Sequence, residues 1–318
     1  MNMQPQRYLP APHLRHFIDL VDWDRGRIRK LLKEAVRLKK SHAKGKAKPV
    51  LKGRVLGLLF EKPSLRTRVS FQAGISQLGG EAVFLSQSDS GLGNRESLPD
   101  VARTLSQYVD AVVLRTFRHE TVEEFARWSA CPVINGLSDY YHPCQALGDL
   151  LTLVEVCGND LEGRTLVFVG DGNNVARSLA IACGKIGMHF ILSAPKGYGF
   201  DRQFVDLYRE QFGSGPVADA DPRHAVTSAD VIYTDVWASM GQEAQTAERR
   251  RHFTPYQVNE ELLGLAPPQA RVMHCLPAHR GEEITDAVID GPQSVVFDQA
   301  ENRLHVQKAI MVWALGAG

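Results

Sequence analysis

The stretch Val55–Phe71, which reads VLGLLFEKPSLRTRVSF, decides the fold class of this chain. Its first six residues form an apolar run of the length of a buried strand, and the residues from Ser64 onward suit the start of a helix. A strand that ends in a short turn and leads into a helix is the repeating unit of a parallel sheet. We therefore predict an α/β fold in which Ser64 caps this helix.

The start of this helix is also suited to binding a phosphate. Backbone N–H groups and the positive end of the helix dipole point outward from a helix N-terminus. Arg66 and Arg68 add two guanidiniums there, and positive side chains oppose the dipole unless an anion is present. The alternative is an ordinary capped helix whose first turn is a solvated basic surface.

Further apolar runs alternate with helical patterns to the end of the chain, as in parallel sheets covered by helices on both faces. We predict two series of strands. The first series comprises residues 55–60, 82–85, 111–114 and 132–135. The second series comprises residues 165–169, 190–193, 231–234, 272–274 and 295–297.

Two domains follow from this division, each a mostly parallel sheet with helices on both faces. We expect residues 1–146, completed by a C-terminal helix at about 301–318, to form one domain and residues 147–300 the other. Ligands of open α/β sheets bind at the carboxyl ends of the strands. We therefore expect the active site in the interdomain cleft.

The composition is that of an ordinary enzyme rather than of a nucleic-acid-binding or membrane protein. The 318 residues include 37 basic and 36 acidic side chains, so the net charge is +1 and no overall field attracts nucleic acid. The basic stretch from Arg25 to Arg54 has apolar residues at helical spacing, which indicates an amphipathic helix with a solvated basic face. No apolar run approaches the roughly 20 residues that a membrane-spanning helix needs.

The cysteines indicate the compartment. They are five in number and include no Cys-x-x-Cys pair, which argues against structural zinc and a disulfide framework. We therefore expect reduced thiols and a cytoplasmic localisation. The acid-poor N-terminus leaves a cleaved organelle-targeting peptide as the alternative.

Polar motifs follow nearly every predicted strand. They are Ser64–Arg68, Arg115, His142–Gln145, Asp171–Asn174, Asp235–Gly241 and His274–Pro277. Each motif alone is a weak signal. Because the carboxyl ends of parallel strands share one edge of a sheet, their ordered recurrence predicts a functional site.

Two other types of site fit these motifs poorly. Gly170-Asp171-Gly172 suggests a dinucleotide site, but Val175 stands where a third glycine is expected and the next strand has no acid at its end. His274 and His279 suggest a metal site but have no third ligand in view. We expect neither a metal nor an organic cofactor.

Taken together, the motifs make the chain resemble the ornithine carbamoyltransferases, of the same superfamily as the aspartate carbamoyltransferases, over nearly its whole length. The motifs that carry the resemblance are SLRTR from Ser64, HPCQ from His142, GDGNN from Gly170, DVWASMG from Asp235 and HCLPAHRGEE from His274. The first two are superfamily motifs, and the last three point to the ornithine branch. The resemblance implies carbamoyl transfer from carbamoyl phosphate to L-ornithine, giving L-citrulline and phosphate. It also implies a homotrimer with active sites at subunit contacts.

The resemblance further implies the roles of individual residues. The carbamoyl phosphate site would comprise Ser64, Leu65, Arg66, Thr67, Arg115, His142, Gln145, Cys275, Leu276 and Arg303. The ornithine site would comprise Asn174, Asp235, Ser239 and Met240. The catalytic residues would be Cys275, Asp235, Arg115 and His142.

Two positions depart from the family pattern. Leu65 stands where threonine is usual, and Gly91 stands where a neighbouring subunit usually supplies a glutamine. Gln87 and Arg95 are the candidate replacements for that glutamine. We expect the reaction type to be retained and carbamoyl phosphate affinity to be the property that these changes affect.

The chemistry leaves several alternatives open. An alkylamine has a pKa of about 10.4 in water and must lose a proton to react; Cys275 and Asp235 are the candidate acceptors. Cys275 could instead be a small packing residue, as we expect for Cys144, and Asp235 a turn former. The alternative substrates are an N-acylated ornithine and putrescine. A non-catalytic phosphate- or dinucleotide-binding protein is the alternative from a different functional class.

Overall fold

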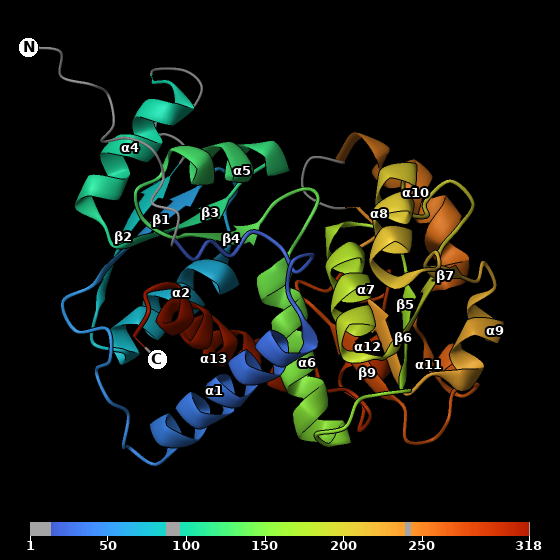
Figure 1. Cartoon of the computed structure of the whole chain (residues 1–318). Coiled ribbons are helices and arrows are strands. Elements are labelled where there is room, and N and C mark those ends of the chain that lie inside the picture. The colour runs from blue at the N-terminus through green and yellow to red at the C-terminus, as the bar shows by residue number, and fades with distance from the viewer. Residues whose placement is uncertain (1–13, 87–95, 239–242, 318) are drawn as a thin grey trace, which may run out of the picture. The chain divides into compact units, whose positions relative to one another are not determined.

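The computed structural model describes residues 14–86, 96–238 and 243–317. The chain divides into two compact units, which Figure 1 shows with their labelled elements. The first unit comprises Met1–Asp22, Gly26–Leu147 and Arg303–Gly318, and the second comprises Trp23–Arg25 and Gly148–Asn302. Three of these boundaries fall inside helices, namely α1 (Arg25–Ala43), α6 (Pro143–Cys157) and α13 (Val296–Ala314).

The first unit is built on a parallel sheet with the strand order β2-β1-β3-β4. Its strands are β1 (Val55–Phe60), β2 (Glu81–Ser86), β3 (Ala111–Arg115) and β4 (Val133–Leu137). Its helices are α1 (Arg25–Ala43), α2 (Leu65–Gln77), α4 (Leu98–Tyr108) and α5 (His119–Trp128), with parts of α6 and α13. Within this unit α4 and α5 cover one face of the sheet, and α2 and α13 lie on the other (Figure 1). Every residue of β3 is therefore buried.

The second unit is built on a parallel sheet with the order β7-β6-β5-β8-β9. Its strands are β5 (Thr165–Val169), β6 (His189–Ser193), β7 (Val217–Ala218), β8 (Val231–Thr234) and β9 (Arg271–His274). Its helices are α7 (Asn174–Ile186), α8 (Arg202–Phe212), α9 (Pro222–Ala225), α10 (Thr246–Phe253), α11 (Glu260–Leu263) and α12 (Asp286–Ile289). Apolar residues of β5 and β8 pack with Trp237, Phe253 and Val288 in one core cluster.

The predicted fold class is confirmed, and each predicted strand except the last is present. The prediction of a strand at residues 295–297 is wrong, because Val296 and Phe297 begin α13. The segment makes only an isolated bridge to β9 among the described residues: the N–H of Val295 donates to the carbonyl of Val272 at 3.0 Å, and the N–H of Val272 donates to the carbonyl of Gln293 at 2.9 Å. Phe297 is 63% exposed, so this apolar run is not the buried run of a central strand.

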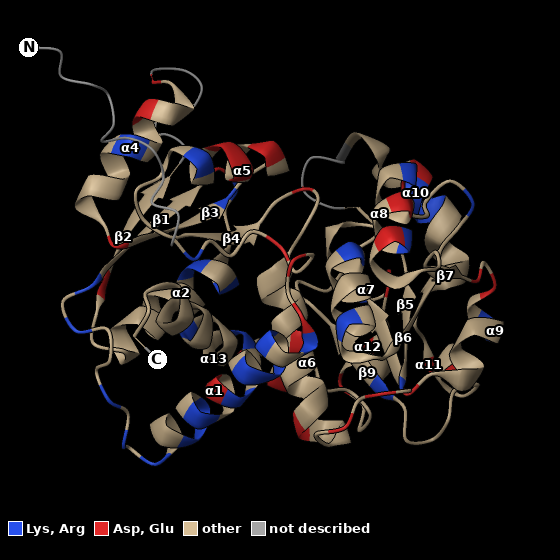
Figure 2. Ribbon diagram, viewed as in Figure 1, with Lys and Arg blue, Asp and Glu red and all other residues tan. Residues whose placement is uncertain are grey.

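The basic stretch near the N-terminus forms an amphipathic helix, as predicted. Helix α1 buries Ile28, Leu31, Leu32, Ala35 and Leu38, while Lys and Arg residues are spread along its length (Figure 2). Among the described residues, no helix combines the length and apolar character needed to cross a membrane.

Candidate active site

The carboxyl ends of β1, β3 and β4 gather the first group of polar residues. Phe60 at the end of β1 pairs with Arg115, and Arg115 pairs with Leu137 of β4. Ser64 follows β1, and His142 lies directly before α6. We refer to the side chains of this region as the arginine cluster, which consists of Ser64, Arg66, Thr67, Arg115, His142, Gln145 and Arg303.

The N-terminus of α2 has the geometry expected of an anion site. Ser64 is the N-cap, with extended backbone, and its hydroxyl accepts a hydrogen bond from the N–H of Thr67 at 3.2 Å. The predicted cap is thus confirmed. Leu65 is 75% exposed, so its backbone N–H is the group it can offer to an anion at the helix terminus.

Arg66 and Arg68 occupy different environments although they are two residues apart. Arg66 is half-buried in the first turn of α2. The guanidinium of Arg68 lies 3.7 Å from the centre of the Phe84 ring on β2, as a cation–π pair. Arg68 is therefore stabilised by an aromatic side chain, and it provides a control for the role of Arg66.

Three basic residues of the arginine cluster are buried, which is uncommon without a compensating charge. The exposed fractions are 6% for Arg115, 4% for His142 and 4% for Arg303. Arg303 reaches from α13 to α2, where its Nη2 donates to the hydroxyl of Thr67 at 2.9 Å. Burial, and then the positive charges of Arg303 and Arg115, hold the pKa of His142 well below its usual value. His142 is therefore neutral at pH 7, and the cluster presents a positive field suited to a dianion.

The lowered pKa of His142 predicts a pH-dependent loss of stability in acid. The unfolded chain takes up a proton near pH 6.5, whereas the native imidazole resists protonation, so this contribution is present above pH 6.5 and is lost as the pH falls below it. Between pH 7.5 and 5.5 this histidine lowers the free energy of unfolding by about 1.4 kcal/mol. Replacing His142 by asparagine should abolish that decrease. Urea unfolding at both pH values measures this difference.

The exposed His279 provides the comparison, since its replacement by glutamine removes an imidazole that is not buried. An equal pH dependence in the native chain and the His142→Asn variant would contradict the assignment of the buried neutral imidazole.

The carboxyl ends of β5, β8 and β9 gather a second group of polar residues. Val169 of β5 pairs with Thr234 of β8, which in turn pairs with His274 of β9. The residues that follow β8 and β9 are Asp235 and Cys275, which are therefore neighbours. We refer to this group as the Asp235 cluster, which consists of Asp171, Asn173, Asp235, Arg249 and Cys275.

Asp235 is held by hydrogen bonds from three directions. Its Oδ1 accepts from the N–H of Val236 at 2.8 Å and from the Sγ of Cys275 at 3.0 Å, and its Oδ2 accepts from the Nδ2 of Asn173 at 2.8 Å. The carboxyl is only 7% exposed. A carboxylate fixed in this way is suited to binding a positively charged amine.

Asn173 bonds to Asp235 although no role is predicted for it from the sequence, which assigns ornithine binding to the adjacent Asn174. The Oδ1 of Asn173 caps α7 by accepting from the N–H groups of Val175 and Ala176 at 3.0 Å each. Asn174 is the first residue of α7, and its Oδ1 accepts from the same N–H of Val175 at 3.0 Å. An asparagine directly before a helix is a capping signal, and that signal could have separated the two.

Arg249 is the second residue that was missed. It is 5% exposed, and its guanidinium donates twice to the Oδ2 of Asp171, at 2.8 and 2.7 Å, and once to the carbonyl of Trp237 at 2.9 Å. Burial raises the pKa of Asp171, and Arg249 opposes that shift. Arg249 stands in a run of three arginines, which is typical of a solvated surface, so the sequence carried no signal for it.

His274 orders the turn that carries Cys275. Its Nδ1 accepts from the N–H of Leu276 at 2.8 Å, and its Nε2 lies 2.9 Å from the Oε1 of Glu283. Leu276 has a φ of 56° and precedes a cis peptide bond to Pro277. Donor atoms of Asp235, His274 and Cys275 lie within 4.8 Å of one another, but a metal ligand from His274 would have to break one of these two bonds.

Some predicted residues cannot be placed. Ser239, Met240 and Gly91 lie outside the described residues, as do the two candidate replacements for the glutamine. Cys144 is buried on α6, where burial raises the pKa of its thiol to about 12 and its Sγ donates to the carbonyl of Asn135 at 3.3 Å. Cys144 is thus a packing residue, as predicted.

The family model and the relatives described here all point to the same protein family. The family described as aspartate/ornithine carbamoyltransferase matches with its carbamoyl-P binding domain at residues 15–155 and with its Asp/Orn binding domain at residues 162–314. A Bacillus subtilis protein named ornithine carbamoyltransferase is 52% identical over 297 residues, or 92% of each chain. A Methanopyrus kandleri protein of the same name is 50% identical over 305 residues, or 95% of this chain and 97% of its own.

Solved structures agree with these relatives. The structure of an ornithine carbamoyltransferase from Pyrococcus furiosus matches with a TM-score of 0.91 at 48% identity, covering 95% of this chain and 97% of that one. The corresponding structure from Thermus thermophilus matches with a TM-score of 0.85 at 44% identity, covering 94% of this chain and 98% of that one.

Proposed function

The chain belongs to the aspartate/ornithine carbamoyltransferase family, and on that premise we propose that it transfers the carbamoyl group of carbamoyl phosphate to the δ-amine of L-ornithine. The products are L-citrulline and phosphate. The observation that carries this proposal is that relatives named for ornithine match both halves of the chain over nearly their whole length.

The arginine cluster is the proposed carbamoyl phosphate site. Ser64, Leu65, Arg66 and Thr67 would bind the phosphate, whose charge suits the helix N-terminus and the guanidinium of Arg66. Arg115, His142 and Gln145 would bind the carbamoyl end, with Arg303 beside them. The two buried guanidiniums, Arg115 and Arg303, support this role, because arginine binds phosphate oxygens through charge-assisted hydrogen bonds. Cys275 and Leu276 are proposed to reach the same substrate.

The Asp235 cluster is the proposed ornithine site. Asp235 would hold the amine, and Asn174, Ser239 and Met240 would complete the site. The bonds that fix Asp235 support this role, since a preorganised carboxylate binds an ammonium without being reordered. Asn173 and Arg249 are proposed as positioning residues, because they act through Asp235 and through the Trp237 segment.

The reaction requires attack by the amine nitrogen, stabilisation of the oxyanion and loss of a proton from the nitrogen. The neutral amine nitrogen attacks the carbonyl carbon and forms the new C–N bond, after which the C–O bond to phosphate breaks and phosphate leaves with the electron pair. The guanidinium of Arg115 and the N–H of the neutral His142 imidazole would stabilise the oxyanion, each such donor contributing on the order of 3 kcal/mol. The nitrogen must also lose a proton. The thiol of Cys275 donates to Asp235, so Asp235 is the first acceptor that we assign.

Assembly and compartment are also proposals. A homotrimer with shared active sites is what the family resemblance implies. We place the protein in the cytoplasm, which the thiol state of all five cysteines supports.

Amine specificity tests the proposed function. L-citrulline should form from carbamoyl phosphate and L-ornithine, and kcat/KM should be at least 100-fold lower with putrescine, N-acetylornithine or aspartate. Product from another of these amines alone would keep the reaction class and overturn the ornithine assignment. No product from any amine, with folded protein that binds phosphate, would favour a non-catalytic phosphate-binding protein.

A further inference from the structure

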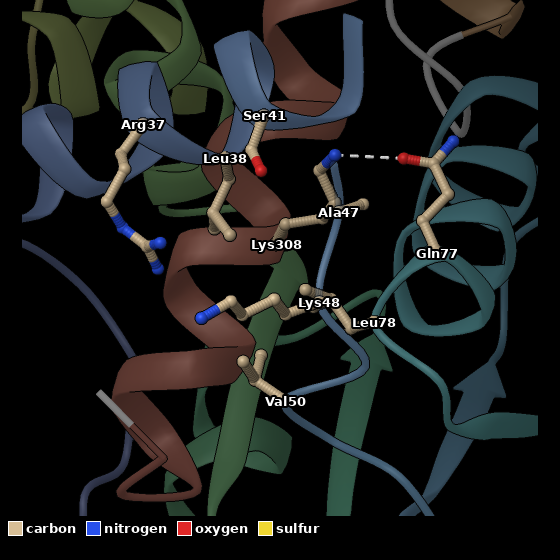
Figure 3. Close-up of a pocket in the computed structure, with 9 residues that line it drawn as sticks. All are labelled: Arg37, Leu38, Ser41, Ala47, Lys48, Val50, Gln77, Leu78 and Lys308. Atoms are coloured by element: carbon tan, nitrogen blue, oxygen red, sulfur yellow. Dashed lines mark hydrogen bonds between the residues drawn. The ribbon is translucent and has the colours of Figure 1, made fainter. Parts of the chain in front are cut away.

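A small pocket in the first unit lies apart from the arginine cluster. It has a volume of about 50 Å³ and lies between α1, the loop that follows α1, α2 and α13 (Figure 3). The residues that line it are Arg37, Leu38, Ser41, Ala47, Lys48, Val50, Gln77, Leu78 and Lys308. None of the roles proposed above uses these side chains.

Lys308 is the most deeply buried polar residue of this pocket. It is 2% exposed, and its ammonium donates to the Oε1 of Gln77 at 2.9 Å. An ammonium out of water is costly unless it is paired with a negative charge, and the amide of Gln77 is neutral. Burial accordingly lowers the pKa of Lys308 to about 8, so the amine is still mostly protonated at pH 7.

The remaining polar groups of the pocket are positive or neutral. Among the described residues that line it, Arg37, Lys48 and Lys308 are basic and none is acidic. Arg37 is partly neutralised by Glu34, to which it donates at 2.7 and 2.5 Å, and the hydroxyl of Ser41 donates to the carbonyl of Lys46 at 2.8 Å. Lys48 and Lys308 therefore supply most of the uncompensated charge.

The size of the pocket limits what can bind. A cavity needs about 10–15 Å³ to hold one water-sized atom. The pocket of about 50 Å³ therefore has room for on the order of four such atoms. A tetrahedral oxyanion has four oxygen atoms, whereas a nucleotide or a peptide would not fit. Lys48 is exposed and lies on the loop, so an ion can enter beside it.

We propose that this pocket is a binding site for a small tetrahedral oxyanion such as inorganic phosphate, held by Lys308 and Lys48 between α1, α2 and α13. The ion would supply the negative charge that the buried ammonium of Lys308 needs. The inference does not rest on the proposed enzymatic function, because charge, burial and size alone carry it.

Phosphate binding to the Arg66→Ala variant tests this proposal, because that change weakens the site proposed at the start of α2. Calorimetric titration with inorganic phosphate at pH 7, with ionic strength held constant by NaCl, should still show binding. Adding Lys308→Met should weaken that binding at least tenfold. Adding Lys46→Met should not, since Lys46 is an exposed lysine of the same loop and does not line the pocket. Sulfate should compete with phosphate, and acetate should not.

Three results would overturn the proposal. They are no phosphate binding in the Arg66→Ala variant, binding that Lys308→Met leaves unchanged, and an equal loss caused by Lys46→Met. Circular dichroism and thermal unfolding establish that the variants fold. If Lys308→Met does not fold, Lys48→Met takes its place, with an expected severalfold weakening; unchanged binding in that variant would then overturn the proposal.

Discussion

Replacing Arg66 by alanine is expected to lower kcat/KM for carbamoyl phosphate by 100- to 1,000-fold, or about 3–4 kcal/mol. Arg66 lies in the first turn of α2, where a leaving phosphate would meet the helix terminus and the capped Ser64. Removal of the guanidinium leaves the backbone donors in place, so the fold and the cap should survive. Initial-rate kinetics at varied carbamoyl phosphate concentration measure the effect.

The matched control is Arg68→Ala. It removes the same charge from the same helix turn, but this guanidinium stacks on Phe84. We expect kcat/KM to fall less than threefold, with a small loss of stability from the broken cation–π contact. Similar losses of activity in the two variants would show that Arg66 contributes through general charge and would contradict its assignment to the phosphate.

Replacing Asp235 by asparagine is expected to raise KM for ornithine about 100-fold and to lower kcat as well. The change keeps the shape of the side chain but removes the charge that an ammonium would pair with. It also puts an amide where the thiol of Cys275 and the amide of Asn173 now donate. Carbamoyl phosphate affinity should change less than threefold, because the groups assigned to its phosphate lie in the arginine cluster and Asp235→Asn alters only the bond to Cys275.

Asp230 provides the control at the other end of the same strand. It precedes β8, and its carboxylate accepts from the N–H of Thr165 at 2.8 Å and from Arg164 at 3.1 Å. Asp230→Asn should cost stability without changing KM for ornithine. A normal KM for ornithine in Asp235→Asn would contradict the ornithine site.

The central strands could be predicted because burial on both faces produces continuous apolar runs. Val55–Phe60 and Thr165–Val169 have the predicted boundaries. Residues 295–297 could not be assigned in this way, since three apolar residues fit a helix as well as a strand. The two-residue strand β7 is too short for any periodic signal.

The candidate site could be located from sequence but not completed. Residues at strand ends, such as Arg115, Asp235 and Cys275, were visible because polar residues there interrupt an apolar pattern. The sequence did not indicate a role for Arg249, because that role depends on hydrogen bonds to Asp171 and Trp237, which are distant in the sequence. Such contacts depend on tertiary packing, which no local pattern encodes.

Binding of carbamoyl phosphate in the absence of ornithine tests the central claim most directly, because the phosphate is assigned to the arginine cluster and the amine to Asp235. We predict that calorimetry will show tight binding to the native chain, unchanged binding to Asp235→Asn and binding at least 100-fold weaker to Arg66→Ala. Unchanged binding to Arg66→Ala, or an equal loss in both variants, would contradict the account.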